Sequence, residues 1–317
     1  TLFSIMIFII ASLGCFFSTK FEFFIFFRLL QASIAAGFLM SRVIIRDITS
    51  ENEAASMIGY VTMGMSIIPL FAPGLGGLIQ MLLGWPSIFL IMSLLGLLLL
   101  LLVFRDLGET KIIKKNKNTK SSASFINLFW EAKFWGYSFT LAFSAGTFFS
   151  FLGGAPYVAT KVYNLNSVVS GLVMGFPAAG YFIGNYLSGR YSKFYGIDYM
   201  ALRGILLVIF GMFICLVITV FYRDTPYFFF GLCSFVGLGN GLIIPNASVG
   251  ILSVNENLSG TAGGIGNAIM IGTGAILASL TSYYLENQSS SSCLVFIMLL
   301  SGALSYTSLY IFVLRNK

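Results

Sequence analysis

The stretch at residues 88–104 reads IFLIMSLLGLLLLLLVF and contains no charged side chain. About 20 apolar residues in helical form are needed to cross the roughly 30 Å hydrocarbon layer of a bilayer. A helix buried in a soluble protein would stop sooner, so this stretch predicts a membrane-spanning helix. The whole chain agrees, because 57% of its 317 residues are hydrophobic and 9% are charged, whereas soluble proteins carry about 25% charged residues.

On both sides of this stretch, apolar runs alternate with polar segments and predict about ten spans. A helix forms its backbone hydrogen bonds internally, as the hydrocarbon layer requires, so we expect helices even where Val, Ile and Phe would favour a strand in water. The expected fold class is all-α, a polytopic transmembrane helical bundle. The predicted spans are residues 2–19, 23–45, 54–83, 86–104, 134–158, 166–189, 200–222, 227–254, 260–285 and 292–314.

One long polar segment divides the predicted spans into four and six. It includes KIIKKNKNTKSSAS at residues 111–124, which is too polar to pack in a helical bundle. We expect residues 1–104 to be the remainder of an N-terminal bundle of four spans. Residues 105–133 should form a cytoplasmic connector, and residues 134–317 a C-terminal six-helix bundle.

The net charge of +7 is explained better by membrane topology than by a nucleic-acid partner. Most basic residues fall in loops on one side of the predicted spans, while Lys20, Lys161 and Arg223 fall on the other side. Lys and Arg concentrate in cytoplasmic loops, so both ends of this chain should face the cytoplasm. We expect a multi-pass membrane protein with the lipid bilayer as its partner and no nucleic acid.

The sequence lacks the residues that several kinds of functional site require. The chain has no His, and Cys15, Cys215, Cys233 and Cys293 lie singly in apolar runs without a CxxC pair, so we expect no metal site. No phosphate-binding GxxxxGKS or GxxxxGKT loop occurs, and the eleven acidic residues fall at span ends or in loops. No nucleophile has a recognisable base partner. The sequence therefore predicts neither an enzyme nor a cofactor.

Arg28 is the one charge well inside a predicted span, in EFFIFFRLLQASIAAG at residues 22–37. Such a charge costs roughly 2.5–3.5 kcal/mol on insertion scales and marks a functional site by default. Gln31 lies three residues later on the same helical face. Two alternatives stay open: the pair serves the function, or Arg28 extends toward the outer headgroups while its stem stays in the apolar layer.

RLLQASIAAGFLMSRVIIRD at residues 28–47, followed by SIIPLFAPGLGG at residues 66–77, resembles the consecutive fourth- and fifth-helix motifs of the major facilitator superfamily. The nearest branch is similar to the Bcr/CflA (bicyclomycin and chloramphenicol resistance) drug:proton antiporters. GNYLSGRYSKFYG at residues 184–196 and GLGNGLIIPNASVGILS at residues 237–253 extend the resemblance over essentially the whole chain. It implies a two-bundle architecture with about ten of twelve spans present. Two further spans, an acid in the first of them and a stronger loop motif are expected before Thr1.

The resemblance also implies roles for particular residues. The fourth-helix pattern R-x-x-Q-G is matched by Arg28 and Gln31, with Ala32 in place of Gly, and implies proton coupling or substrate binding. The fifth-helix antiporter pattern G-P-x-x-G-G, a close helix crossing, is represented by Ala72, Pro73, Gly76 and Gly77. A degenerate cytoplasmic loop motif, without its usual acidic residue, retains Gly184, Arg190, Lys193 and Gly196.

By the same resemblance, the fifth and eighth predicted spans would line a central cavity. For each Phe in this set the alternative is a lipid-facing position. Residues 239–246 are also a break-prone stretch, in which unwound carbonyls would line the path or neighbouring helices would satisfy a kink. The candidate lining residues are Tyr137, Ser144, Thr147, Phe148, Phe151, Asn240 and Asn246.

The resemblance implies a secondary active transporter, and we expect proton-coupled efflux of drugs or small amphiphilic compounds by alternating access. The proton gradient would supply the energy, without a cofactor. A metabolite importer of the same fold is the alternative within transport. A membrane-embedded enzyme or a lipid scramblase is the alternative from another class.

Overall fold

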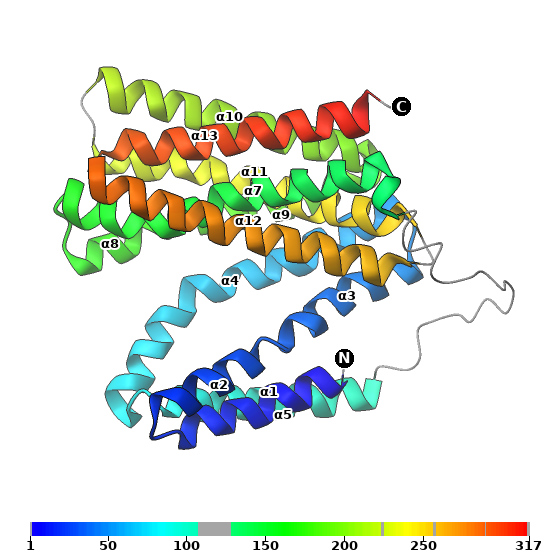
Figure 1. Ribbon diagram of the computed structural model, residues 1–317, viewed down its shortest axis with the longest axis vertical. Coiled ribbons are helices and arrows are strands. Elements are labelled where there is room, and N and C mark those ends of the chain that lie inside the picture. The colour runs from blue at the N-terminus through cyan, green and yellow to red at the C-terminus, as the bar shows by residue number, and fades with distance from the viewer. Residues whose placement is uncertain (1, 107–127, 223–224, 256–257, 289, 316–317) are drawn as a thin grey trace, which may run out of the picture. The chain divides into compact units, whose positions relative to one another are not determined.

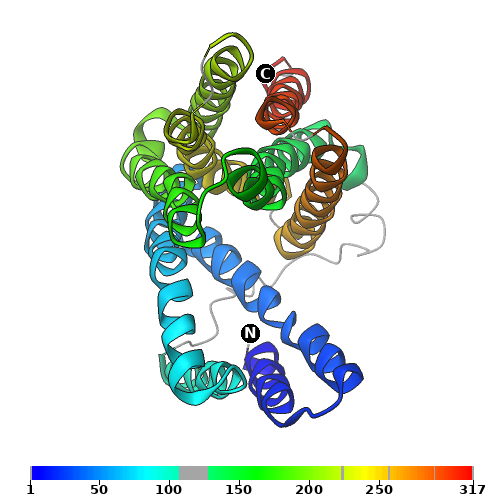
Figure 2. The same ribbon diagram turned by 90° about the vertical axis from the view of Figure 1, so that its left-hand side faces the viewer.

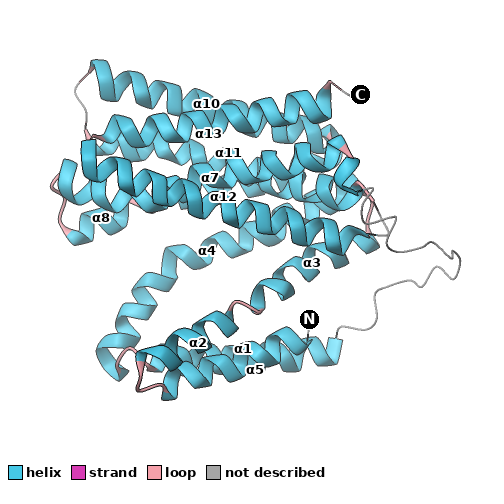
Figure 3. Cartoon of the chain, viewed as in Figure 1, coloured by secondary structure: helices cyan, strands magenta, loops and turns pink. Residues whose placement is uncertain are grey.

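The computed structural model describes residues 2–106, 128–222, 225–255, 258–288 and 290–315 (Figure 1). Within these ranges every regular element is a helix and no strand occurs, as Figure 3 shows by colour. The predicted all-α fold class is therefore confirmed. Most of the predicted connector, residues 107–127, lies outside the described residues.

The helices occupy the predicted apolar ranges, with one helix or two successive helices to each range. Two π-helical turns, Val158–Val162 and Tyr310–Leu314, extend α7 and α13. Six helices of the described residues are long and apolar enough to cross a membrane, namely α5, α7, α10, α11, α12 and α13, and α1 is apolar but shorter. The bounds are α1 (Leu2–Phe17), α2 (Phe21–Gln31), α3 (Ile34–Ile48), α4 (Glu51–Leu83), α5 (Ser87–Asp106), α7 (Ala132–Tyr157), α8 (Ser167–Val173), α9 (Phe176–Tyr195), α10 (Ile197–Phe221), α11 (Pro226–Ser253), α12 (Ser259–Gln288) and α13 (Ser291–Leu309).

The contacts within the chain form two compact units. The first contains Thr1–Ile48 and Phe71–Lys117, and the second contains Thr49–Leu70 and Asn118–Lys317. The N-terminal part of α4 therefore belongs with α7 to α13, and its C-terminal part belongs with α1, α2, α3 and α5. The predicted division into bundles on either side of the connector stays a prediction.

In the second unit, α7 and α11 lie at the centre of the packing. α7 contacts α11, α12 and α13, and α11 contacts α9 and α10; Figure 2 shows these helices nearly end-on. A Cβ atom built on Gly237 of α11 would lie 1.8 Å from the carbonyl oxygen of Pro177 on α9. The two backbones thus touch directly, as small residues allow between helices in lipid, where no hydrophobic force pulls helices together.

In the first unit, α1 packs against α2 and α5. The ring of Phe27 covers Gly14 so closely that a Cβ atom there would lie 2.4 Å from it. On α5, Leu94, Leu98 and Leu101 share one helical face and are 57%, 57% and 62% exposed. An apolar face of this kind is expected where a helix contacts lipid tails.

The break-prone stretch of the eighth predicted span is helical. α11 is continuous from Pro226 to Ser253, so residues 239–246 are not unwound, and the other alternative, a kink satisfied by neighbouring helices, stays a prediction. The glycines of this stretch serve close packing instead. A Cβ atom on Gly239 would lie 2.6 Å from the carbonyl oxygen of Gly204, and one on Gly241 would lie 2.5 Å from the backbone nitrogen of Asn185.

Gly237→Ala tests the backbone contact between α9 and α11. The added methyl group would overlap the carbonyl oxygen of Pro177, and overpacking of this kind costs roughly 1–3 kcal/mol. We expect the unfolding midpoint of the detergent-solubilised protein to fall by about 2–4 °C or more. Gly231→Ala in the same helix is the matched control, because a Cβ atom there meets nothing within 4 Å and Ala is the better helix former. Equal midpoints in a thermal scan would contradict the crossing.

Candidate functional site

Three side-chain hydrogen bonds in series join α2 to α1. The guanidinium of Arg28 donates to Oε1 of Gln31 over 3.0 Å, and Nε2 of Gln31 donates to Oγ of Ser12 over 2.8 Å. Ser12 donates in turn to the carbonyl oxygen of Phe8 over 2.7 Å. Because Ser12 and Gln31 are buried, at 0% and 5% exposure, these bonds hold the amide of Gln31 in one orientation.

Arg28 itself is exposed, and its guanidinium carbon lies 5.7 Å from the ring centroid of Phe89 on α5. In the part of the chain that the structure describes, it forms no ion pair with a carboxylate. A guanidinium stays protonated in proteins, so Arg28 presents a fixed positive charge beside a buried amide. The structure brings together the two residues of the fourth-helix pattern and adds Ser12, whose only signal in the sequence is a hydroxyl group in an apolar run.

The helix breaks directly after Gln31. The backbone N–H groups of Ala32 and Ser33 bond to carbonyl oxygens three residues earlier, both over 3.1 Å, and α3 begins at Ile34; Figure 3 shows the break as a loop. Ser33 also donates to the carbonyl oxygen of Ser4 on α1 over 3.2 Å. The predicted span at residues 23–45 is therefore two helices. A tightened turn inside a helix often marks a hinge, and neither Pro nor Gly signals it here.

A second polar cluster lies between α7 and α11. Ser144 donates to Oδ1 of Asn240, and Nδ2 of Asn240 donates to Oγ1 of Thr147 over 3.4 Å. All three side chains are at most 1% exposed. A narrow gap beside Ser144 and Thr147, too small for a water molecule, extends to Ile205 on α10 and Gly302 on α13. These three predicted lining residues thus lie inside the unit and satisfy one another, and their contact with a substrate stays a prediction.

The aromatic candidates on α7 lie apart from this cluster. Tyr137 donates to the carboxylate of Asp198, in the first turn of α10, over 2.6 Å. Phe151 is 1% exposed. Phe148 is half-buried, and its ring stacks on that of Phe151 with 6.4 Å between the centroids. Of the seven candidate lining residues, six are buried and Phe148 is half-buried.

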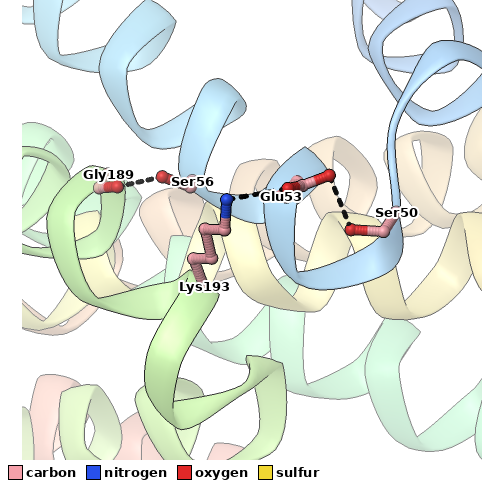
Figure 4. A network of polar contacts seen from close by, with 5 residues as sticks. All are labelled: Ser50, Glu53, Ser56, Gly189 and Lys193. Carbon is pink, nitrogen blue, oxygen red and sulfur yellow. Dashed lines mark hydrogen bonds and ion pairs between the residues drawn. The ribbon is translucent and has the colours of Figure 1, made fainter.

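Polar contacts also join the N-terminal part of α4 to α9 (Figure 4). The ammonium group of Lys193 lies 2.8 Å from Oε1 of Glu53, and Oε2 of the same carboxylate accepts a hydrogen bond from Ser50 over 2.9 Å. One turn further along α4, Ser56 donates to the carbonyl oxygen of Gly189. The sequence singled out Lys193 but not its partner on α4.

Deeper between the same helices, Thr62 donates to Oδ1 of Asn185 over 2.5 Å, and both side chains are buried. One turn further along α9, Ser188 accepts a hydrogen bond over 3.0 Å from the candidate residue Asn246 of α11. α9 therefore carries a polar stripe with partners on both α4 and α11. We call the contacts of Glu53, Ser56 and Thr62 with α9 the α4–α9 seam.

α4 makes its close backbone crossing within this seam. A Cβ atom on Gly59 would lie 2.5 Å from the backbone nitrogen of Gly189. The sequence signal is the run of small residues in AASMIG at residues 54–59, which lets two backbones approach closely. The helix crossing predicted at Ala72, Pro73, Gly76 and Gly77 stays a prediction. All four residues are helical, and a Cβ atom on Gly76 would meet nothing within 4 Å. The side-chain surroundings of the other three are not among the described features.

The predicted cytoplasmic loop motif is helical almost to its end. Gly196 has a φ of +84°, a left-handed conformation that suits glycine, and it separates α9 from α10. A Cβ atom on Gly184 would lie 2.2 Å from the carbonyl oxygen of Leu238. Arg190 is exposed and donates to the hydroxyl group of Tyr186 over 3.2 Å. The motif residues thus act separately, in a turn, a helix crossing and two different side-chain contacts.

The ion pair of the seam is sensitive to pH in one direction. The pKa of Glu53 is lowered below its usual 4.5, chiefly by the hydrogen bond from Lys193. The hydrogen bond from Ser50 and the positive charge of Lys193 lower it further. The pair therefore stabilises the fold above the usual pKa, and this contribution is lost as the pH falls through the lowered one. The side chains of Lys193 and Glu53 are 56% and 43% exposed, so solvent screening keeps the contribution small.

The comparisons with known proteins identify relatives over most of the chain. A family model described as Major Facilitator Superfamily matches residues 1–279. A "Bicyclomycin resistance protein homolog" of Haemophilus influenzae is 29% identical over 78% of this chain and 63% of its own length. An "Uncharacterized MFS-type transporter YdgK" of Bacillus subtilis is 28% identical over 59% of this chain and 48% of its own length. The chain thus spans about half to two-thirds of these relatives.

Two solved structures have the same fold. FucP, a transporter of the Major Facilitator Superfamily in the outward conformation, matches with a TM-score of 0.76 and 11% identity over 98% of this chain and 81% of its own. The human organic anion transporter MFSD10 (TETRAN) matches with a TM-score of 0.70 and 16% identity over 96% of this chain and 76% of its own. At such identities the likeness shows the fold alone.

Thr62→Val tests the buried part of the α4–α9 seam. The variant leaves Oδ1 of the buried Asn185 without its donor, and an unsatisfied buried acceptor costs roughly 1–3 kcal/mol. Thr281→Val is the matched control, because Thr281 is equally buried but bonds only to a carbonyl oxygen of its own helix. We expect a lower thermal unfolding midpoint in detergent for Thr62→Val than for Thr281→Val. A reversed order would show that the seam hydrogen bond does not stabilise the unit.

Proposed function

The chain belongs to the Major Facilitator Superfamily, and we propose that it works as a secondary transporter that exports drugs or small amphiphilic compounds in exchange for protons. The family and the structural neighbours are transporters and not enzymes. The names of two relatives, the bicyclomycin resistance homolog and "Multidrug resistance protein D" of Escherichia coli, which is 25% identical over 84% of this chain and 67% of its own length, support efflux.

The observation that carries the proposal is the Arg28–Gln31 pair beside the break between α2 and α3. A charge inside a span is expensive and is kept where transport or coupling needs it. Arg28 is accessible, is bonded to a buried amide and lies one turn from a backbone break. The pair therefore combines a fixed charge with a point at which the helix can bend.

Arg28 does not carry the proton, because a guanidinium is not deprotonated in proteins. Its charge favours the ionised form of any carboxylate that comes close. In the proposed mechanism such a carboxylate belongs to the part of the relatives' length that this chain does not span. When this carboxylate binds the proton, Arg28 and Gln31 are released and form a different contact. Alternating access then follows because the Arg28–Gln31 pair has two sets of contacts, one for each protonation state of the carboxylate.

The candidate lining residues suit an amphiphilic substrate, since broad aromatic surface with few polar anchors binds by shape. Phe148 is the accessible member of the set. A buried polar cluster between α7 and α11 is formed by Ser144, Thr147 and Asn240. These side chains would contact a substrate only after the packing of the helices changes. We place the transporter in a bacterial inner membrane as a monomer, with both ends of this chain in the cytoplasm.

A metabolite importer of the same fold is the second candidate. The observation in its favour is the fixed positive charge of Arg28, which would suit an anionic substrate better than a cationic drug. The direction of transport separates the two candidates, since efflux lowers and import raises the amount of substrate in the cell.

The pair is tested in the full-length gene, expressed in cells without their own efflux pumps. Arg28→Ala and Gln31→Leu should each slow energised dye export by about tenfold or more, because the coupling group is lost. Glu22→Gln on the same helix, exposed and lying before the pair, is the matched control and should export normally. Dye accumulation is measured by fluorescence with and without a protonophore.

Three outcomes of this assay argue against the proposal. Export that survives the protonophore would exclude proton coupling. Uptake in place of export would favour the importer. Normal export by Arg28→Ala would remove the pair from the mechanism even if efflux itself were confirmed.

A further inference from the structure

Exposed aromatic rings and cations form a continuous row on the outer side of the hairpin made by α9 and α10. The rings of Tyr191 and Tyr195 lie 6.1 Å apart, and those of Tyr195 and Tyr199 stack at 5.3 Å. The guanidinium carbon of Arg190 lies 5.6 Å from the Tyr191 ring, and that of Arg203 lies 5.0 Å from the Tyr199 ring. We call these five residues the Arg–Tyr row, with an arginine at each end.

Both arginines keep free charge and free donors. Arg190 makes one hydrogen bond, to the Tyr186 hydroxyl group, and Arg203 makes only its ring contact; among the described residues neither forms an ion pair. Lys193, on the same helix, is by contrast neutralised by Glu53. A guanidinium stacked on a ring is held in place, and its planar fork matches phosphate oxygens in two-point contacts.

The two arginines of the row lie at similar distances from the turn between the helices, and Tyr195 lies at the turn itself. Arg190 precedes the end of α9 at Tyr195 by five residues, and Arg203 follows the start of α10 at Ile197 by six. At 1.5 Å per residue each arginine is about 8–9 Å from the turn along its helix. Tyrosines concentrate at this headgroup level of a membrane.

Below Arg203 the same face of α10 becomes apolar. Leu206, Phe210 and Phe213 follow it at intervals of three, seven and ten residues, which places them on one helical face. Their side chains are 41%, 57% and 57% exposed. A cation at headgroup depth above a continuous apolar surface fits one kind of ligand, with an anionic head and long apolar tails.

We propose that the Arg–Tyr row is a binding site for the headgroup of an anionic phospholipid. The phosphate is held by Arg203, an acyl chain lies along Leu206, Phe210 and Phe213, and Arg190 adds positive charge at the other end of the row. Charge complementarity selects an anionic lipid over a zwitterionic one, because no carboxylate of the described residues is paired with either arginine to balance an added cationic headgroup. The site rests on membrane insertion of α9 and α10 and is independent of what the protein transports.

The site is tested on the full chain purified in detergent. Binding of short-chain phosphatidylglycerol and phosphatidylcholine is measured by native mass spectrometry, and inorganic phosphate is added as a competitor. We expect phosphatidylglycerol to bind in preference to phosphatidylcholine. Since each basic residue near an anionic lipid strengthens binding by roughly fivefold, Arg190→Gln with Arg203→Gln should weaken it by about 25-fold.

Lys161→Gln is the matched control, because Lys161 is an exposed cation outside the row; it should leave lipid binding unchanged. The double Arg→Lys variant keeps the charge but not the planar fork and should restore only part of the binding. Unchanged unfolding midpoints in zwitterionic detergent would show that all variants are folded.

The proposal is overturned by any of three results. The double Arg→Gln variant could bind phosphatidylglycerol as the native chain does. Lys161→Gln could lose as much binding as the double variant, which would indicate charge without a site. Inorganic phosphate at equal concentration could displace the lipid, which would show that the acyl chain contributes nothing and that the site takes free phosphate.

Discussion

Close approach of helix backbones is the constraint on which the rest of this structure depends. In a hydrocarbon layer apolar side chains gain nothing by leaving the lipid, so helices associate where their surfaces fit closely. In the second unit that fit is made by glycine. The backbones of α9 and α11 touch at Gly237, and those of α4 and α9 touch at Gly59. A side chain at either position would separate the helices, and the polar contacts beside them would be lost.

Those polar contacts are mostly neutral, and they lie where the backbones are nearest. Thr62 bonds to Asn185 one turn from Gly59, and Asn246 reaches Ser188 across the α9–α11 contact. Amide and hydroxyl groups can be buried in pairs at low cost, whereas a charge cannot. The accessible charge of Arg28 in the other unit is therefore a different kind of feature. It lies beside a helix break and not at a close crossing, and its amide partner is fixed by Ser12.

The sequence predicts the helices and the fold class well because an apolar run of spanning length has few other uses. It also singled out Arg28 with Gln31, since a cation in such a run is conspicuous. It did not predict the break after Gln31, which contains neither Pro nor Gly. It left open whether the stretch with Gly239 and Gly241 unwinds or forms a kink, whereas these two glycines lie at packing surfaces. Glycine in a long helix has both uses, and only the neighbouring helix decides between them. The pairing of Glu53 with Lys193 depends on two segments far apart in the chain, so no local pattern reveals it.

The motif at residues 184–196 shows how one helix can serve two surfaces at once. Lys193 and Arg190 are three residues apart and differ by about 60° around α9. This rotation is enough to turn one toward Glu53 on α4 and to leave the other on the tyrosines of the outer face. The two side chains also differ in kind. A lysine suits the point contact with Glu53, and an arginine suits a flat stack with a free planar fork. Exchange of the two would leave the charge of the segment unchanged and would remove the geometry of both contacts. The pattern of basic residues in this segment is therefore better read by the face on which each one lies than by the net charge of a loop.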